Sequence, residues 1–331
     1  MNQITFSAQR GQSKNTLTPM VFLPWLILAV VFLFPFLDKN PYHIDVLVTA
    51  GIFILLALGL NVIVGYAGIL NLGYAAFFAF GAYTYAIANL HFHIPFWGGV
   101  FVSALATAAF GMLLAFPALR LSGDYLAIVT LGAGEITRIV LNNLEMTGGP
   151  NGLLGIDHPR LPFSNFDFGV KSQPYYFLVL AFILIVIFFL RRLETSRLGR
   201  AWRALREDEL AASAMGINLA WAKLTAFGIA GFIAGIAGCF FAAKQGTISP
   251  DSFDFTVSVM VLAMIVLGGI GSIPGVILGA VVLTVLPECL RDFSMYRMLI
   301  FGFAMIAMML FRPSGIWGSV RFRTQPTRPS E

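Results

Sequence analysis

The clearest chemical signal in the sequence is a pair of opposite charges inside an apolar segment. Glu135 and Arg138 lie in the stretch 123–143, which is otherwise rich in Leu, Ile, Val, Ala and Gly. A spacing of three residues places both side chains on one face of a helix, where they can form an ion pair. Ionisable groups inside a membrane are expensive, and they commonly mark ion or substrate paths. The pair therefore predicts either a site on a transport path or a structural link between helices.

Patterns for metal binding and covalent catalysis are absent from the sequence. His91 and His93 have no carboxylate at ligand spacing, and Cys239 and Cys289 form neither a CxxC motif nor a zinc-like pattern. The sequence also lacks GxxxxGK[ST], HExxH and GxSxG. We therefore expect no metal or cofactor, no ATP bound by this chain, and no enzymatic activity of its own.

The composition indicates the medium that surrounds these groups. Of the 331 residues, 58% are hydrophobic and 11% are charged, whereas an average soluble domain is about 25% charged. This composition excludes an ordinary soluble protein, a disordered chain and a nucleic-acid binder. It predicts an integral membrane protein whose surface contacts lipid.

The apolar segments predict an all-α bundle that crosses the membrane repeatedly. A transmembrane helix needs about 20 apolar residues, and on this basis we expect about 10 spans, with eight or nine as alternatives. The predicted spans are 20–37, 45–64, 69–90, 95–119, 124–141, 175–190, 224–243, 255–267, 274–286 and 295–311.

The distribution of Lys and Arg predicts the orientation of the bundle. These residues are concentrated in the loop 191–223 and near both termini, which the positive-inside rule assigns to the cytoplasm. The predicted division is a cytoplasmic tail 1–19, a transmembrane domain 20–311 with a cytoplasmic loop 191–223 and a periplasmic loop 142–174, and a cytoplasmic tail 312–331.

Glycines at helix-face spacing predict close helix packing. Gly231 and Gly235 form one GxxxG pattern, and Gly271, Gly275 and Gly279 form a double one. Lipid is as apolar as leucine, so membrane helices associate through small residues that allow close approach. These patterns fit either packing within one chain or a seam with a second subunit.

Two glycine-rich segments, 65–73 and 268–275, are predicted to be turns or broken helices. Transporters place broken helices near their translocation paths, where protein or water covers the irregular backbone. The candidate path residues in these segments and in the polar span are Tyr66, Asn71, Tyr74, Thr130, Glu135 and Arg138.

The loop 191–223 contains a segment with strong helix propensity. Residues 200–215 include neither Gly nor Pro and are dominated by Ala, Leu, Arg and Glu. Gly216 follows at a position suited to a C-terminal cap. The pattern predicts one short rigid helix on the cytoplasmic face, which either docks on another protein or lies on the lipid surface.

Several stretches, in order along most of the chain, resemble one known family. They match the bacterial branched-chain amino acid permeases of the LivM type, which are subunits of ABC importers. The stretches are 123–143 (GDYLAIVTLGAGEITRIVLNN), 147–152, 199–218 (GRAWRALREDELAASAMGIN), 240–252, 266–272 and 312–315.

The resemblance implies a non-enzymatic permease subunit in the bacterial inner membrane that carries leucine, isoleucine, valine or related amino acids. It implies a heterodimer with a second, LivH-like permease, two cytoplasmic ATPases that bind the ATP, and a periplasmic binding protein. Two alternatives stay open. One is an ion-coupled secondary transporter with Glu135 as its coupling site, and the other is a permease of the same family for urea or amides.

ABC importers dock the ATPase through a short helix with a loose EAA…G pattern. Residues 209–216 are similar, with one extra residue after the glutamate. A carboxylate placed at Ala212 is expected to break this docking and to leave the permease folded. The candidate residues for coupling to the ATPase are Arg200, Arg203, Arg206, Glu209, Ala211, Ala212 and Gly216.

Overall fold

The computed structural model describes residues 40–119, 121, 123–160 and 172–289, together with 35, 302, 306, 310 and 315–317. The chain divides into two compact units, 1–40 and 41–331, and every element described below belongs to the second. The predicted spans 20–37 and 295–311 and both predicted tails lie outside the described residues or almost entirely so. The total number of spans and the orientation therefore stay predictions.

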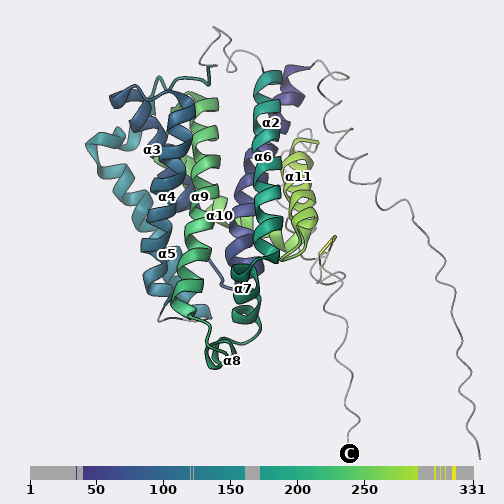
Figure 1. The fold of residues 1–331 in the computed structure, drawn as a ribbon. Helices are drawn as coiled ribbons and strands as arrows, with labels where there is room; N and C mark the ends of the chain where they lie inside the picture. The colour runs from purple at the N-terminus through teal and green to yellow at the C-terminus, as the bar shows by residue number, and fades with distance from the viewer. Residues whose placement is uncertain are drawn as a thin grey trace, which may run out of the picture. The chain divides into compact units, whose positions relative to one another are not determined.

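The described part of the second unit is largely α-helical (Figure 1). Its α-helices are α2 (Pro41–Asn61), α3 (Tyr74–Phe92), α4 (Phe96–Ala118), α5 (Asp124–Asn143), α6 (Ser172–Thr195), α7 (Arg197–Glu207), α8 (Glu209–Ala214), α9 (Leu219–Gln245), α10 (Phe255–Gly268) and α11 (Ile273–Cys289).

Short elements lie between these helices. A π-helix, η2 (Val62–Tyr66), continues α2, and the strands β1 (Leu153–Leu154) and β2 (Thr247–Ile248) form one antiparallel pair. The remaining elements are the 3₁₀-helices η3 (Glu145–Thr147), η4 (Gly149–Asn151) and η5 (Pro250–Phe253).

The helices agree with the predicted membrane-spanning class. Each of the predicted spans between residues 45 and 286 overlaps one described helix. Among the described residues, 6 helices are long and apolar enough to cross a membrane, and α11 is apolar but shorter. The six are Pro41–Tyr66, Phe96–Pro117, Tyr125–Asn143, Gln173–Thr195, Leu219–Gln245 and Pro250–Gly268.

The helix α9 lies at the centre of the described unit, between α3 and α4 on one side and α2 on the other. Its glycines explain the close approach to α4. A Cβ atom at Gly231 would lie 2.5 Å from the carbonyl oxygen of Thr107, and one at Gly235 would lie 2.5 Å from that of Ser103. The structure therefore places this GxxxG pattern in a seam within the chain.

The second glycine pattern packs α11 against α10. Gly275 and Gly279 face the backbone of Gly268 and Met264, with no room for a Cβ atom at either position. Gly271 lies outside both helices, in the turn between them, at φ 85°. The helix α2 packs against both α11 and α6.

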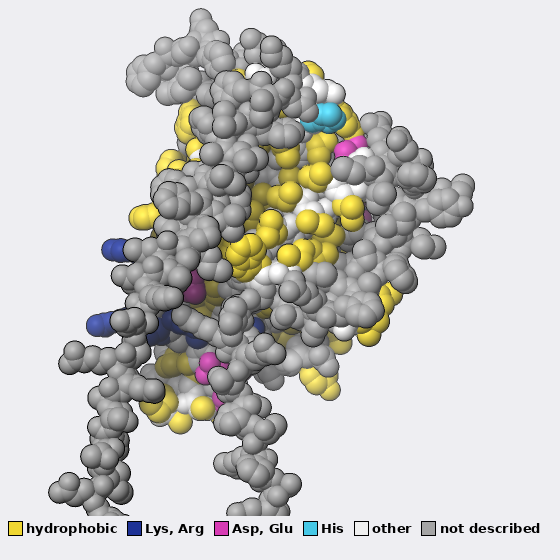
Figure 2. Space-filling model, turned by 90° about the vertical axis from the view of Figure 1, so that its right-hand side faces the viewer, with side chains coloured by type: hydrophobic (Ala, Val, Ile, Leu, Met, Phe, Trp, Pro, Cys, Tyr) yellow, Lys and Arg dark blue, Asp and Glu magenta, His cyan; other side chains and the backbone are white. Residues whose placement is uncertain are grey.

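One face of this unit presents hydrophobic side chains over its middle. Figure 2 shows hydrophobic side chains across one face, with Lys and Arg side chains gathered towards the end that carries α7 and α8. Such a band fits helices whose middle lies in hydrocarbon and whose ends reach water.

Candidate functional site

The connection from α6 to α9 folds as two helices, so the prediction of one helix over 200–215 is wrong. Asp208 lies between α7 and α8 in an extended conformation, at φ −158° and ψ 117°. Its Oδ1 atom accepts hydrogen bonds from the backbone N–H groups of Leu210 and Ala211, at 2.8 and 2.9 Å. Aspartate stabilises a helix start by satisfying these free N–H groups, and this local bonding competes with a continuous helix.

The first of these helices, α7, is packed into the protein. Trp202 is 0% exposed, and its Nε1 atom donates a hydrogen bond to the carbonyl oxygen of Ala222 at 2.9 Å. Leu205 is also buried. At the start of α7, the hydroxyl of Ser196 accepts a hydrogen bond from the backbone N–H of Gly199 at 3.3 Å. These contacts fix α7 relative to α9 and to the end of α6.

The second helix, α8, is anchored at its start and exposed beyond it. The Nζ atom of Lys223 lies 2.5 Å from Oε1 of Glu209, and the lysine side chain is almost fully buried. Leu210 and Met215 are 81% and 83% exposed. Gly216 ends the helix at φ 81°, a conformation that favours glycine.

The structure alters one expectation about α8. Ala212 is 3% exposed, so its side chain already lies against this chain. A carboxylate at Ala212 would disturb α8 itself, and the expectation that it would leave the fold intact is not supported. The exposed positions of α8 are the better sites for testing a partner.

The three candidate arginines of α7 do not form one surface. Arg200 and Arg203 bond to the end of α6, through Nη1 to the Thr195 oxygen at 2.9 Å and Nη2 to the Glu194 oxygen at 3.1 Å. Arg206 instead points towards the membrane helices, where its Nη1 atom donates to the carbonyl oxygen of Gly65. Burial lowers the pKa of Arg206, and Glu207 acts in the opposite direction. The guanidinium stays charged in either case.

The two glycine-rich segments meet near Arg206. The segment 268–275 contains the end of α10, a turn and the start of α11, so a turn joins two helices there. The backbone N–H of Gly271 in this turn donates to Oδ1 of Asn61, at the end of α2, at 2.9 Å. Tyr66, a candidate path residue, is buried in η2.

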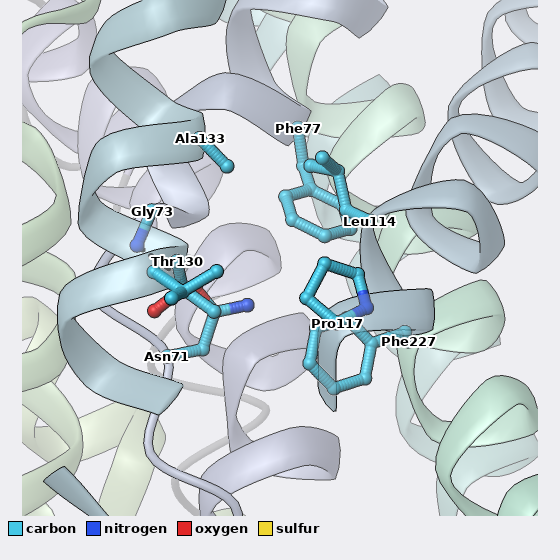
Figure 3. A pocket seen from close by; sticks show the side chains of 9 residues that line it. Asn71, Gly73, Phe77, Leu114, Pro117, Thr130, Ala133 and Phe227 are labelled. Carbon is cyan, nitrogen blue, oxygen red and sulfur yellow. Dashed lines mark hydrogen bonds between the residues drawn. The ribbon is translucent and has the colours of Figure 1, made fainter. Parts of the chain in front are cut away.

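A small cavity lies between α3, α4, α5 and α9 (Figure 3). It has a volume of about 10 Å³, enough for roughly one water molecule. Asn71 accepts a hydrogen bond from the Gly73 N–H at 2.9 Å, and its Nδ2 atom points into the cavity. Thr130 accepts one from the Leu72 N–H at 3.1 Å. The other lining residues are Gly73, Phe77, Leu114, Pro117, Val129, Ala133 and Phe227.

Of the six candidate path residues, Asn71 and Thr130 line this cavity and the other four do not. The hydroxyl of Tyr74 donates to the carbonyl oxygen of Ala230 at 3.0 Å, in the core between α3 and α9. Glu135 and Arg138 lie further along α5 and do not line this cavity. The six candidates therefore occupy several places.

Glu135 and Arg138 form the ion pair that their spacing predicted. Nη2 of Arg138 lies 2.5 Å from Oε1 of Glu135, and the arginine and glutamate side chains are 30% and 41% exposed. Nη1 of Arg138 also lies 3.5 Å from Oδ1 of Asp251, in η5. The sequence analysis missed Asp251, because its link to Arg138 crosses 113 residues.

No set of three or more His, Cys, Asp or Glu side chains among the described residues is arranged to hold a metal ion. The described residues instead combine a charged cluster on a helix long and apolar enough to span a membrane, a small, mostly apolar cavity with two polar side chains, and a short helix with exposed apolar side chains. Ionisable groups on such helices commonly mark ion or substrate paths, and exposed apolar side chains commonly mark protein contacts.

Comparison with known proteins decides the family. Residues 42–309 match the family described as the permease component of branched-chain amino acid transport systems. The chain belongs to this family.

Permeases of this family from enteric bacteria are similar to the chain over most of its length. The high-affinity branched-chain amino acid transport system permease protein LivM of Salmonella typhimurium is 46% identical over 324 residues, covering 91% of this chain and 76% of that protein. LivM of Escherichia coli K12 is 47% identical over 313 residues, covering 88% and 73%. The predicted resemblance to LivM-type permeases is confirmed.

A second kind of permease in the same family is also similar. The LivH permease protein of Escherichia coli K12 is 26% identical over 291 residues, covering 80% of this chain and 91% of that protein. No solved structure matches the chain significantly. Both LivM and LivH of Escherichia coli K12 are named as permease proteins of the high-affinity branched-chain amino acid transport system.

Proposed function

We propose that this chain is the LivM-type permease subunit of an ABC importer for branched-chain or related amino acids in a bacterial inner membrane. The names of its relatives support this substrate class. In the proposed complex, the chain pairs with a LivH-like permease and receives substrate from a periplasmic binding protein. Two cytoplasmic ATPases bind and hydrolyse the ATP.

The observation that carries the ATPase partnership is the docking face, which we define as Leu210, Ala211, Met215 and Gly216. Its two large apolar side chains are mostly exposed, on a helix that Glu209 and Lys223 tie to α9. Large apolar side chains that stay exposed on a short segment outside the predicted spans favour a protein contact. The predicted cytoplasmic location of this loop places the face where an ATPase can reach it.

For the translocation path, we propose the face of α5 that carries the Glu135–Arg138–Asp251 cluster. Its ions are only partly covered by this chain, and partly exposed charges are costly against lipid. A water-filled path or the second permease at this face would remove that cost. Asn71 and Thr130 line the separate cavity between α3, α4, α5 and α9, and this cavity would widen if α5 moved away from α3 and α4.

The proposed ATPase partnership is tested by Leu210→Glu. A buried, unpaired carboxylate at a protein contact costs several kcal/mol, and about 4 kcal/mol is roughly a thousandfold in affinity. We expect normal amounts of the variant in the membrane, loss of ATPase copurification, and loss of leucine uptake. The measurements are copurification from solubilised membranes and uptake of labelled leucine by cells.

Ala220→Glu is the matched control. It adds the same charge to an exposed position in the first turn of α9, where the helix dipole favours an acidic side chain. The control should keep both the ATPase and the uptake. Persistent uptake in Leu210→Glu that collapses with a protonophore at constant ATP would contradict the proposal, because a secondary transporter draws on an ion gradient.

A further inference from the structure

We infer that Arg206 is a positioning residue that joins the docking loop to the broken end of α2 and to the turn between α10 and α11. Through it, a displacement of α8 by an ATPase would reach the membrane helices. This inference rests on the proposed docking of α8. It concerns a different contact, however, which lies inside the permease and not on its exposed face.

The end of α2 offers a carbonyl group that needs a partner. The helix changes to a π-helix over Val62–Tyr66, and π-helical turns are frequent at functional sites. The loop that follows satisfies two carbonyl oxygens of this turn, with Ala67 N–H donating to Val62 at 3.1 Å and Ile69 N–H donating to Ile63 at 3.0 Å. The carbonyl oxygen of Gly65 accepts its hydrogen bond from Arg206.

The stem of Arg206 crosses Gly68, whose backbone conformation strongly favours glycine. Gly68 has a φ of 71°, which disfavours any other residue. A Cβ atom there would lie 2.6 Å from Cγ and 3.0 Å from Cβ of Arg206. The loop after η2 therefore lies directly against the arginine side chain.

The guanidinium group also reaches the turn between α10 and α11. A Cβ atom at Gly271 would lie 3.1 Å from Nη1 of Arg206 and 3.3 Å from the carbonyl oxygen of Gly65. The Gly271 N–H is held in turn by Asn61, which is 0% exposed. One side chain of α7 thus lies against two segments that are remote in sequence, the end of η2 with its following loop and the turn between α10 and α11.

The position of Arg206 in α7 suits it to transmit a displacement. It lies in the last turn of α7, and Glu207 and Asp208 alone separate it from α8. A hydrogen bond from a charged donor is about twice as strong as a neutral one, and the partly buried setting screens it little. A push on α8 that turns the end of α7 would therefore move Gly65 and Gly271 together.

The test uses the assembled complex of both permeases, the ATPases and the binding protein, reconstituted in vesicles. The measured quantity is the amount of leucine transported per ATP hydrolysed, together with ATPase copurification. For Arg206→Gln we expect unchanged copurification, continued ATP hydrolysis, and at least a fivefold fall in leucine per ATP. Arg206→Lys should recover part of the ratio, because an ammonium group still donates to Gly65 but cannot span both segments.

Arg197→Gln is the control, because Arg197 is exposed at the first residue of the same helix. For this control, the amount of leucine transported per ATP hydrolysed should equal that of the parent chain. A parental ratio in Arg206→Gln would overturn the inference. Loss of ATPase copurification in Arg206→Gln would also overturn it, since Arg206 would then belong to the docking contact.

A second variant decides the matter if Arg206→Gln does not accumulate in membranes. Gly68→Ala keeps the charge and displaces the arginine stem, so it should also lower the amount of leucine per ATP. An unchanged ratio in Gly68→Ala would overturn the inference. The proposed docking is tested separately, and it fails if the ATPase still copurifies with Leu210→Glu. Failure of the docking proposal and failure of the Arg206 inference are therefore distinguishable.

Discussion

The helices α7 and α8 are neighbours in the chain, yet they relate to the rest of the protein in opposite ways. The apolar side chains of α7, Trp202 and Leu205, are buried, whereas Leu210 of α8 and Met215 just after it are exposed. Both helices have defined caps, so neither is a frayed extension of the other. The difference lies in what covers their apolar side chains.

The comparison separates residues that build the permease from residues that are available to a partner. α7 packs against α6, α9 and η2 and behaves as part of the membrane domain. The ion pair between Glu209 and Lys223 ties α8 to α9, whereas Leu210 and Met215 stay exposed. Substitutions in α7 should therefore change the stability of the chain, and those on the outer face of α8 should change its assembly.

The largest effect is expected for Trp202→Ala. Removing a fully buried tryptophan leaves a cavity and removes the hydrogen bond to Ala222, which together cost about 3–5 kcal/mol of unfolding free energy. Denaturant unfolding of the purified chain in detergent measures the loss. Trp221→Ala is the control, because Trp221 is 61% exposed and its loss should change stability by less than about 0.5 kcal/mol. Equal effects would contradict the burial of α7.

A smaller effect is expected for Glu209→Gln. This variant removes the carboxylate opposite the buried Lys223, and the cost is about 1–3 kcal/mol because one partner of the pair is partly exposed. Glu207→Gln removes an exposed charge of the same sign two residues away and should cost less than about 0.5 kcal/mol. The same unfolding assay compares the two variants. If Glu207→Gln is the more destabilising, the pair with Lys223 is not what anchors α8.

The break between the two helices is tested by Asp208→Ala. Loss of an N-cap side chain costs about 1 kcal/mol, and the amides of Leu210 and Ala211 lose their acceptor. Hydrogen exchange at these two amides should become faster, while exchange within α7 stays unchanged. Asp208→Asn keeps a capping oxygen and should behave like the parent. Faster exchange along all of α7 would indicate that the two helices unfold as one.

The sequence predicts the membrane helices well because their signal is local. A run of apolar residues long enough to span hydrocarbon identifies a helix without reference to its neighbours, and each predicted span between residues 45 and 286 overlaps a described helix. The family resemblance was equally visible, since its stretches cover most of the chain. The ion pair of Glu135 and Arg138 followed from helix spacing alone.

The features that the sequence did not predict depend on contacts between distant segments. Arg206 points inwards because of Gly65, which lies 141 residues earlier. Tyr74 donates to Ala230 in the core, 156 residues later, although its position beside a glycine-rich segment suggested a path residue. The break at Asp208 was missed for a different reason. Helix propensity favoured continuity, whereas an aspartate followed by an acidic residue is itself a start signal.

The smallest change in stability is expected for Leu210→Ala and Met215→Ala. These variants therefore separate most clearly a role in assembly from a role in stability. Both side chains are mostly exposed, so truncating them should change the unfolding free energy of the isolated chain by less than about 0.5 kcal/mol. Each should nevertheless weaken ATPase binding, by about 1–2 kcal/mol or roughly tenfold, if its side chain is buried in the assembled importer. Unfolding in detergent and titration with the purified ATPase measure the two quantities on the same sample. A loss of stability without a loss of binding would assign these side chains to packing within the chain and would remove the distinction between α7 and α8.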